Sequence, residues 1–452
     1  MNVKSICCIG AGYVGGPTMA VIALKCPEIK VTVVDHNKEK ISLWNDSDIS
    51  KIPVFEPGLY EIIKKTRNKN LFFSEDIDKA IQNSEMIFMA VNTPTKSSGE
   101  GAGMASDLQY VEKCAKNIRD VAKTKKIVVE KSTLPVRTAE KIKEILNQNP
   151  KGINFEVLSN PEFLAEGTAI KDLYKSDRVI IGGENTKSGI EATSLLKNIY
   201  KKWIPAKKIL TLNIWSAELS KLASNAMLAQ RISSINSLSF LCEKTGANIN
   251  EVSMAIGMDH RIGDKFLNPS PGFGGSCFQK DILNLVYIYK YYGLDDVAEY
   301  WHQVVKLNNH QRHRIANKIE DYVTSNNLDK TAIILGWAFK KDTNDSRESS
   351  SIYISFELLK KGFKLFIYDP KVDQKRIISD IDGLNNSQNN TVNNIHQNIK
   401  VLNDFNLVIN REDPTLILTE WDEFKEINNL KTKLKIFDFR NIINREKTIF
   451  SL

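Results

Sequence analysis

Short apolar runs alternate with amphipathic segments along the first half of the chain. The runs are rich in β-branched residues and occupy 3–9, 30–35, 86–91, 126–132, 155–160 and 178–183. Apolar residues recur at helical spacing between most of them. Strands that alternate with helices predict a parallel, doubly wound α/β sheet.

The pattern changes near Trp215, where helical spacing continues to Gly246 and returns from Asp281 to about Val323. Strand-like runs reappear at 331–336, 364–370, 407–410, 415–419 and 434–439. We therefore predict two Rossmann-like doubly wound domains (1–213 and 326–452) joined by a helical central domain (214–325). The asparagine-rich run 382–398 is expected to be an exposed loop.

Composition narrows the class of protein. A chain of 452 residues, 42% hydrophobic and 26% charged, is too long for one ordinary core. Neither a signal peptide nor a run of about 18 apolar residues is present, so no membrane association is expected. Six cysteines without a CxxC pair predict neither disulfides nor a metal site, and they favour a reducing, cytoplasmic location.

The net charge of +8 raises the possibility of nucleic-acid binding. Lysine and arginine are, however, interleaved with acidic residues and form no long basic run. We therefore expect no nucleic-acid partner. A small substrate that carries phosphate suits this charge equally well.

The segment GAGYVG matches the dinucleotide fingerprint through Gly10, Gly12 and Gly15. A predicted strand precedes it, a helix follows, and Asp35 ends the next strand, which is the context that the fingerprint requires. The carboxylate of Asp35 favours NAD over NADP, although nearby Lys40 weakens this preference. A glycine turn of purely structural use is the alternative.

Two loops follow strands of the first sheet and should meet at its carboxyl edge: VEKSTLPVRT (129–138) and LSNPEFLAEG (158–167). Thr133, Glu162 and Glu166 would face that crevice, although polar residues are common in any loop. Lys221 and Asn225 lie at i and i+4 on a predicted helix, and their spacing alone favours an exposed face.

The second α/β domain lacks the fingerprint, because Trp337 and Phe339 stand where glycines would be needed. Its first loop offers Lys340, Lys341 and Arg347 instead. These cations beside an aromatic ring suit phosphates and a stacked base, but a solvated basic loop is an equal alternative.

The glycine-rich stretch NPSPGFGGSCFQKD (268–281) contains the most reactive candidate. If a helix begins near Ser276, Cys277 lies in its first turn, where the helix dipole stabilises a thiolate. Asp281 would then lie one turn further on, close enough to hold a water molecule. The other five cysteines should be inert; Cys7 and Cys8 fall in a predicted strand, and Cys114 and Cys242 on apolar helix faces.

The chain resembles the UDP-glucose/GDP-mannose dehydrogenase family from Ile6 to about Arg440. The resemblance rests on the glycine turn GAGYVG and on the two loops 129–138 and 158–167. It rests also on the strings VNTPTK, ELSKLASNAMLAQRISSIN, GFGGSCFQKD and GWAFKKDTNDSRESSSIYIS. The longest strings are similar to the animal-type UDP-glucose enzymes. The resemblance implies a C6 alcohol oxidised twice to a carboxylate with two NAD and one water, through a thiohemiacetal and a thioester on Cys277.

The same resemblance implies roles for individual residues. Lys221 and Asn225 would stabilise the oxyanion, Asp281 and Thr133 would position water, and Glu162 would act as general acid and base. Cofactor contacts would come from Gly10, Ala11, Gly12, Tyr13, Val14, Gly15, Asp35, Lys40, Val91, Asn92, Thr93, Pro94, Thr95, Ser132, Thr133, Glu166 and Arg347. UDP-glucose would be bound by Glu162, Phe163, Leu164, Ala165, Glu166, Lys221, Asn225, Arg261, Phe266, Asn268, Phe273, Gly274, Phe339, Lys340 and Arg440.

In the family, the arginine that matches Arg261 reaches a neighbouring subunit, which implies a dimer or a larger assembly, up to a hexamer. The chain departs from the animal-type pattern at Asn268, where a lysine is usual, at FDFRN (437–441), and in ending at Leu452 without the longer tail. Two alternatives remain: a dehydrogenase of GDP-mannose or UDP-N-acetylmannosamine, and a non-catalytic nucleotide-sugar binding protein.

Overall fold

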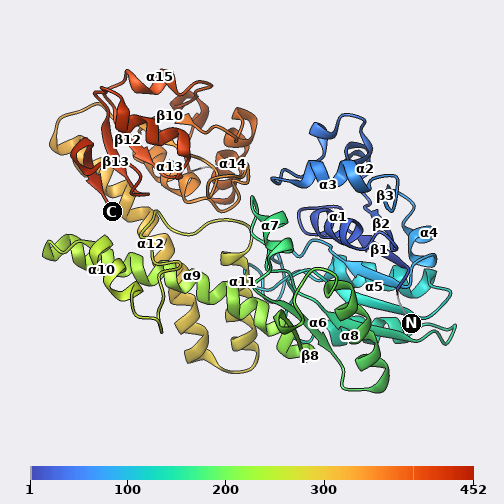
Figure 1. Cartoon of the computed structure of the whole chain (residues 1–452). Helices are drawn as coiled ribbons and strands as arrows, with labels where there is room; N and C mark the ends of the chain where they lie inside the picture. The colour runs from blue at the N-terminus through green and yellow to red at the C-terminus, as the bar shows by residue number, and fades with distance from the viewer. Residues whose placement is uncertain (1–2, 390) are drawn as a thin grey trace. The chain divides into compact units, whose positions relative to one another are not determined.

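The structure is a computed structural model that describes residues 3–389 and 391–452 (Figure 1). It divides into two compact units, Met1–Ser224 and Asn225–Leu452. Among the described residues, no helix combines the length and the apolar character needed to cross a membrane. No group of three acidic, histidine or cysteine side chains in the same described residues could hold a metal ion.

The first unit is built on an eight-stranded sheet of order β3-β2-β1-β4-β5-β6-β7-β8. Its strands are β1 (Ser5–Ile9), β2 (Lys30–Val34), β3 (Leu71–Ser74), β4 (Met86–Met89), β5 (Lys126–Glu130), β6 (Phe155–Ser159), β7 (Val179–Gly183) and β8 (Ile209–Asn213). The six predicted strands are confirmed. The expected fully parallel order is wrong at one place, because β6 and β7 pair antiparallel through Ser159 and Gly182.

Helices cover both faces of this sheet, as alternation along the strands requires. Ile6 and Cys8 face one hydrophobic cluster, and Cys7 and Ile9 face another. The first cluster includes residues of α1 (Gly15–Lys25), α2 (Lys38–Asn45), α3 (Leu59–Thr66), α7 (Ala169–Tyr174) and α8 (Lys187–Tyr200). The second includes residues of α4 (Ile77–Gln82), α5 (Gln109–Val121) and α6 (Thr138–Asn147).

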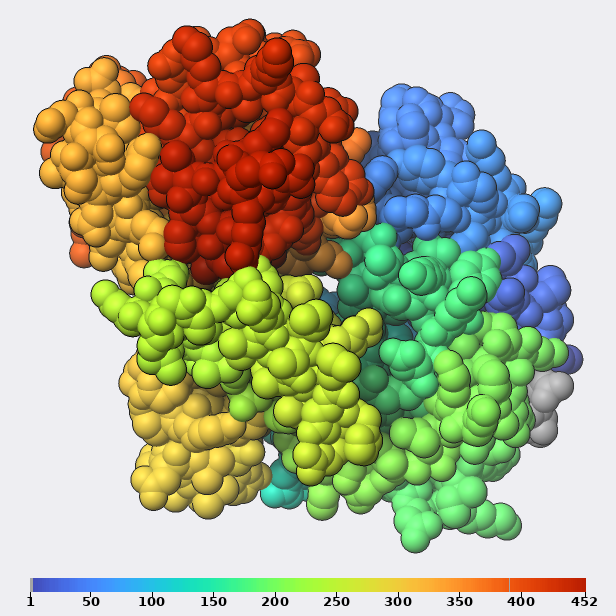
Figure 2. Space-filling view, turned by 60° about the vertical axis from the view of Figure 1, so that its left-hand side comes forward, coloured from blue at the N-terminus to red at the C-terminus, as the bar shows by residue number. Residues whose placement is uncertain are grey.

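The helical middle of the chain is confirmed. It consists of α9 (Ile214–Thr245), which crosses the boundary of the two units, and of α10 (Ile249–Gly257), α11 (Phe278–Tyr291) and α12 (Asp295–Ser325). Within the second unit, the chain end packs on the start of α10, because Asn250 donates to the Leu452 carbonyl and Arg445 to the Asn248 side chain. Figure 2 shows these two segments side by side, in red and yellow-green.

A six-stranded parallel sheet of order β11-β10-β9-β12-β13-β14 forms the core of the second unit. Its order repeats that of the first six strands of the other sheet. The strands are β9 (Thr331–Leu335), β10 (Lys364–Tyr368), β11 (Ile399–Val401), β12 (Pro414–Ile417), β13 (Lys435–Asp438) and β14 (Thr448–Ser451). Its helices are α13 (Ser350–Lys360), α14 (Gln374–Ser387) and α15 (Asn406–Ile409).

Two expectations fail in this unit. The run 407–410 is not a strand, since α15 occupies Asn406–Ile409 and the third strand position is taken by β11. The asparagine-rich run is partly helical, because α14 continues to Ser387 and a 3₁₀ turn occupies Ile395–Asn398. The buried side chain of Asn385 ties the end of α14 to the segment that follows it, because it pairs with both the N–H and the carbonyl of Val392. Residue 390 of this run lies outside the described residues.

Candidate active site

The predicted glycine turn joins β1 to α1 in a form that only glycines allow. Gly10 has φ of +113°, and a Cβ there would lie 2.2 Å from the Ala90 carbonyl oxygen. A Cβ on Gly15 would lie 2.0 Å from the Gly10 oxygen, so helix and strand pack directly. A Cβ on Gly12 would meet nothing within 4 Å. The turn is thus tight at its two ends and open in its middle, at the N-terminus of α1, where a pyrophosphate is bound in such folds.

Asp35 lies directly beside this turn. Its carboxylate accepts hydrogen bonds from the N–H of Ala11 at 2.9 Å and of Asn37 at 3.0 Å, and Lys40 Nζ lies at 3.1 Å. Burial raises the pKa of Asp35, but these hydrogen bonds and the lysine outweigh it, so the pKa is lowered overall. A fixed negative charge at this position accepts ribose hydroxyls and repels a 2′-phosphate.

The loops after β4 and β5 are joined by hydrogen bonds. Ser132 Oγ donates to the Val91 carbonyl at 2.6 Å, and Thr93 Oγ1 donates to the Thr133 carbonyl at 3.2 Å. These four predicted cofactor residues therefore lie together at the carboxyl edge of the sheet. Asn92 is exposed, while Pro94 and Thr95 are half-buried in the same loop.

Glu162 and Lys221 form a buried ion pair in the first unit. Their charged atoms are 3.3 Å apart, and the side chains are only 7% and 4% exposed. The expectation of an exposed helix face for Lys221 and Asn225 is thus wrong, since Asn225 is buried too. The ring of Phe163 lies 5.2 Å from Lys221 Nζ and 4.0 Å from the Arg178 guanidinium.

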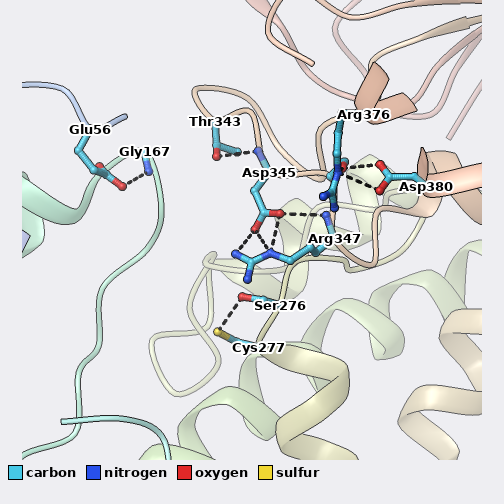
Figure 3. Close-up of polar contacts among 10 residues, drawn as sticks. Glu56, Gly167, Ser276, Cys277, Thr343, Asp345, Arg347, Arg376 and Asp380 are labelled. Atoms are coloured by element: carbon cyan, nitrogen blue, oxygen red, sulfur yellow. Dashed lines mark hydrogen bonds and ion pairs between the residues drawn. The ribbon is translucent and has the colours of Figure 1, made fainter. Parts of the chain in front are cut away.

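Glu56 fixes the loop that contains Glu162 and Glu166. Its carboxylate accepts hydrogen bonds from the N–H of Gly167 at 2.8 Å and of Ala169 at 3.0 Å (Figure 3). Glu162 also caps its own loop by accepting from the N–H of Leu164 at 2.7 Å. A loop held at both ends by carboxylates presents a defined surface at the end of β6.

Cys277 immediately precedes α11 and is the N-cap residue of that helix. It is half-buried, whereas the other five cysteines are buried, as predicted. Ser276 Oγ lies 3.6 Å from Cys277 Sγ (Figure 3). Burial raises the pKa of the Cys26 thiol to about 11 and of the Cys114 thiol to about 12, which keeps those thiols protonated.

Asp281 lies in the first turn of α11, and its N–H donates to the Cys277 carbonyl at 2.9 Å. Asn225 Nδ2 donates to Asp281 Oδ2 at 2.6 Å. The predicted catalytic residues of the second unit are therefore in direct or near-direct contact. Lys221 and Asn225 are one turn apart on α9, Lys221 in the first unit and Asn225 in the second.

Polar side chains of α12 hold the glycine-rich loop. Asn308 pairs with both the N–H and the carbonyl of Phe273, at 2.8 and 3.1 Å. The buried guanidinium of Arg312 donates to the carbonyls of Phe273 and Glu348, at 2.8 and 2.9 Å. The loop thereby has a fixed backbone, and the adjoining segment that leads to α13 is held by the same arginine.

The loop after β9 packs on the glycine-rich loop within the second unit. A Cβ on Gly275 would lie 3.0 Å from the Phe339 ring, and Gly275 N–H donates to the Arg347 carbonyl. Arg347 forms a bidentate ion pair with Asp345, at 2.7 Å for its closest contact (Figure 3). Arg440 donates to the Phe339 carbonyl at 3.3 Å, so the predicted substrate residues Phe339 and Arg440 are neighbours.

Trp337 is fully buried in the turn after β9, at the place that Ala11 occupies in the turn after β1. Asp369, at the end of β10, accepts from the N–H of Trp337 and Ala338, which repeats the contact of Asp35 with Ala11. The indole donates to Asp380 at 3.0 Å. The second sheet therefore keeps the acidic residue of a dinucleotide turn, but a tryptophan stands beside it.

Three predicted substrate residues are exposed: Arg261 and Phe266, which precede the glycine-rich stretch, and Asn268, its first residue. Arg261 pairs with Asp259 at 2.6 Å. Phe266 has φ of +60°, a rare conformation for a residue with a side chain. The structure does not bring these residues into the buried sets described above.

Sequence reasoning missed the residues that hold others in place: Glu56, Arg178, Asn308 and Arg312. Each lies far in sequence from the loop that it contacts, so no local spacing marks it. The one available signal was the concentration of polar residues at 308–312 within a predicted helix, where a buried face should be apolar.

Replacing Arg312 by methionine is expected to lower the free energy of unfolding by about 3 kcal/mol, because the Glu348 carbonyl loses a charged donor and the Phe273 carbonyl keeps only Asn308. Urea unfolding measures the change. Arg314→Met, on the same helix as Arg312, removes a partly exposed ion pair with Glu243 of α9; it is the matched control and should cost less than about 1 kcal/mol. Equal effects of the two variants would contradict the role of Arg312.

A dinucleotide turn at the carboxyl end of β1, together with a half-buried cysteine at a helix start, defines an NAD-dependent oxidoreductase. Sequence models of three domains of one family match nearly the whole chain: its NAD binding domain at 4–204, its central domain at 215–310 and its UDP binding domain at 333–445. The chain belongs to the UDP-glucose/GDP-mannose dehydrogenase family.

Individual relatives agree with this assignment. UDP-glucose 6-dehydrogenase 3 of Arabidopsis thaliana is 52% identical over 98% of this chain and 94% of its own length. UDP-glucose 6-dehydrogenase of Drosophila melanogaster is 51% identical over 98% and 93%. Plant and insect relatives are thus about equally similar. The solved UDP-glucose dehydrogenase of Pyrobaculum islandicum has a TM-score of 0.82 and 27% identity, covering 100% of this chain and 97% of its own.

Proposed function

We propose that this protein oxidises UDP-glucose at C6 to UDP-glucuronate, using two NAD and one water. The observation that carries the proposal is the position of Cys277 at the start of α11, with Asp281 one turn away and bonded to Asn225. A thiol there can trap an aldehyde, which a simple alcohol dehydrogenase does not need to do. The plant and insect UDP-glucose 6-dehydrogenases, about half identical over nearly the full length, support the choice of sugar.

The residues of the first unit fit the cofactor. Gly10 and Gly15 leave no room for a Cβ, while the space at Gly12 is open, and Asp35 is fixed at the edge of the turn. Bound NAD supplies the hydride acceptor for each of the two oxidations. Further contacts are proposed for Lys40, the 91–95 loop, Ser132, Thr133, Glu166 and Arg347.

In the first half of the reaction, the C6 alcohol loses a hydride and its hydroxyl proton and becomes an aldehyde. Cys277 Sγ then adds to C6, and the former carbonyl oxygen takes up a proton, which gives a thiohemiacetal. Lys221 and Asn225 stabilise the negative charge that develops on this oxygen. The burial of Lys221 strengthens that effect, because a charge acts more strongly when water is excluded.

In the second half, loss of another hydride and of the hydroxyl proton converts the thiohemiacetal to a thioester. Asp281 and Thr133 position a water molecule, and Glu162 accepts its proton as the water attacks C6. The C–S bond breaks, the thiolate of Cys277 leaves, and UDP-glucuronate is formed. One water is consumed, and two NADH are produced for each sugar.

We propose that the three regions divide this work: 1–213 binds NAD, 214–325 contributes the cysteine loop, and 326–452 binds the UDP group. In the last region Phe339 offers a ring, and Lys340 lies 5.7 Å from that ring. Arg440 is the proposed uridine-side arginine. The substrate loop is completed by Phe163, Leu164, Ala165, Phe273 and Gly274, with Arg261, Phe266 and Asn268 as outer contacts.

A stoichiometric assay tests the function. Purified protein with excess NAD and limiting UDP-glucose should release two NADH per sugar, followed by absorbance. One NADH per sugar would indicate a simple alcohol dehydrogenase, and none would indicate a binding protein. Activity with GDP-mannose or UDP-N-acetylmannosamine but not with UDP-glucose would assign another sugar.

We also propose that the protein self-associates and works in the cytoplasm, where its six thiols stay reduced. Apolar side chains are exposed along α9 and α10, among them Leu241 at 61% and Met254 at 65% exposure. Such a surface is typical of an interface between subunits. The exposed Arg261 follows α10 directly, on the same part of the chain.

Leu241→Glu is expected to shift the protein from a dimer or larger species to a monomer, since it places a charge on the apolar surface. Analytical ultracentrifugation measures the shift. Lys244→Glu, one turn further along α9 and also exposed, is the control and should leave the assembly intact. Unchanged sedimentation of Leu241→Glu would reject this surface as an interface.

A further inference from the structure

Two glutamates that the proposed reaction does not use lie side by side inside the first unit. Glu130 ends β5 and is 1% exposed, while Glu218 lies on α9 and is 2% exposed. Each carboxyl group lies within reach of the other, and the buried Glu130 Oε2 has no other hydrogen-bond partner among the described side chains. Glu218 also accepts from the N–H of Arg137 at 2.7 Å and of Ala139 at 2.8 Å, so it caps the start of α6.

The two cations of the adjoining segment, Lys131 and Arg137, have other partners. The Lys131 ammonium is directed to Asn160 Oδ1 and Tyr200 OH, at 3.1 and 3.4 Å. The guanidinium of Arg137 pairs with Glu140 at 2.7 Å. From the neighbouring strands, the register partners of Glu130 are Met89 on β4 and Ser159 on β6, and the Ser159 hydroxyl contributes one hydrogen bond.

Two carboxylates in contact cannot both stay ionised when buried, so they hold a proton between them. Burial and the neighbouring carboxyl raise the pKa of Glu130 well above its ordinary value, and burial raises that of Glu218. Glu218 accepts two backbone N–H groups at the positive end of the α6 dipole, which favours its ionised form. The proton therefore resides on Glu130, which donates to Glu218.

We propose that Glu130 and Glu218 form a one-proton carboxyl pair that positions the loop of Ser132 and Thr133 relative to the helix turn of Lys221. Glu218 lies three residues before Lys221 on α9, and Glu130 lies two residues before Ser132. The far end of the loop is Arg137, whose φ of +76° is unfavourable for a residue with a side chain and is held by its bond to Glu218. The kinetic part of this inference rests on the proposed function.

The pair predicts a specific dependence of stability on pH. Below about pH 4.5 both the folded and the unfolded chain bind the proton. Above that pH the unfolded chain releases it while folded Glu130 keeps it, so the folded state binds more protons and stability falls as pH rises. Thermal unfolding from pH 5 to 9 should show this fall in the wild type, and Glu130→Gln, which mimics the protonated form, should reduce it.

Enzyme kinetics distinguish a carboxyl pair that positions the loop of Ser132 and Thr133 from a pair that only packs in the core. Glu218→Gln, which puts an amide donor against the α6 N–H groups, should lower kcat by about tenfold or more. Glu130→Gln should keep most activity at pH 7 and retain it at alkaline pH, where the wild type loses the shared proton and declines. Glu144→Gln, an exposed change on the same helix α6, is the control for both measurements.

The outcomes separate this inference from the proposed function. Equal losses of activity in Glu130→Gln and Glu218→Gln, or a pH dependence of stability that Glu130→Gln leaves unchanged, would overturn the carboxyl pair. A wild type without dehydrogenase activity would overturn the proposed function, and the unfolding series would still test the pair.

Discussion

Replacing Cys277 by serine is expected to lower turnover of UDP-glucose by about 10³-fold or more, because an alcohol at this position is not ionised and cannot form the thioester. Cys277 is the half-buried cysteine, and it lies at a helix N-terminus that favours a thiolate. NADH absorbance under saturating substrate measures the loss. NAD binding, followed by cofactor fluorescence, should be unchanged, since the glycine turn belongs to the other unit.

A matched control is available on α9. Cys242 is buried and far in sequence from the glycine-rich loop, so Cys242→Ser should keep turnover. Mass spectrometry of the quenched enzyme adds a direct readout, because the sugar thioester should be found on wild-type Cys277 and be absent from the serine variant. Undiminished turnover of Cys277→Ser would exclude the covalent route.

Lys221→Met should lower kcat by about 10²–10³-fold, since it removes a preorganised charge from the developing oxyanion. The affinity for UDP-glucose should change less, because the oxyanion exists only after hydride transfer begins. Steady-state kinetics separate the two effects. Lys244→Met, an exposed change at the end of the same helix, should match the wild type.

The buried partner of Lys221 requires a second variant. Lys221→Met leaves the Glu162 carboxylate without its ion pair, so the single variant should also be less stable. The double variant Lys221→Met with Glu162→Gln should recover stability in urea but not activity. Recovery of activity would mean that the lysine acts through folding alone.

The sequence predicted the central strands well and the edge strands poorly. β1, β4 and β5 are buried on both faces, so they appear as continuous apolar runs. β8, β11 and β14 lie at sheet edges, are partly exposed and have no such run. The false strand at 407–410 has an apolar run of the right length, but four residues cannot distinguish a strand from a helical turn.

In the site, too, local sequence patterns were predicted correctly, whereas contacts between residues far apart in sequence were missed. The glycine turn and the cysteine at a helix start are local patterns, and the structure places them as expected. Lys221 and Asn225 looked exposed from their spacing, because their partners Glu162 and Asp281 lie 59 and 56 residues away in sequence. Arg312, which fixes the glycine-rich loop, is 39 residues from its partner Phe273.

The buried indole of Trp337 makes the two similar sheets unequal. Both have the same order of their first six strands and the same acidic residue beside the first turn, so the architecture is repeated within one chain. In the second copy a single buried indole stands at the turn position that Ala11 holds in the first. One strand order thus carries two differently shaped turns, and this divergence needs no change in topology.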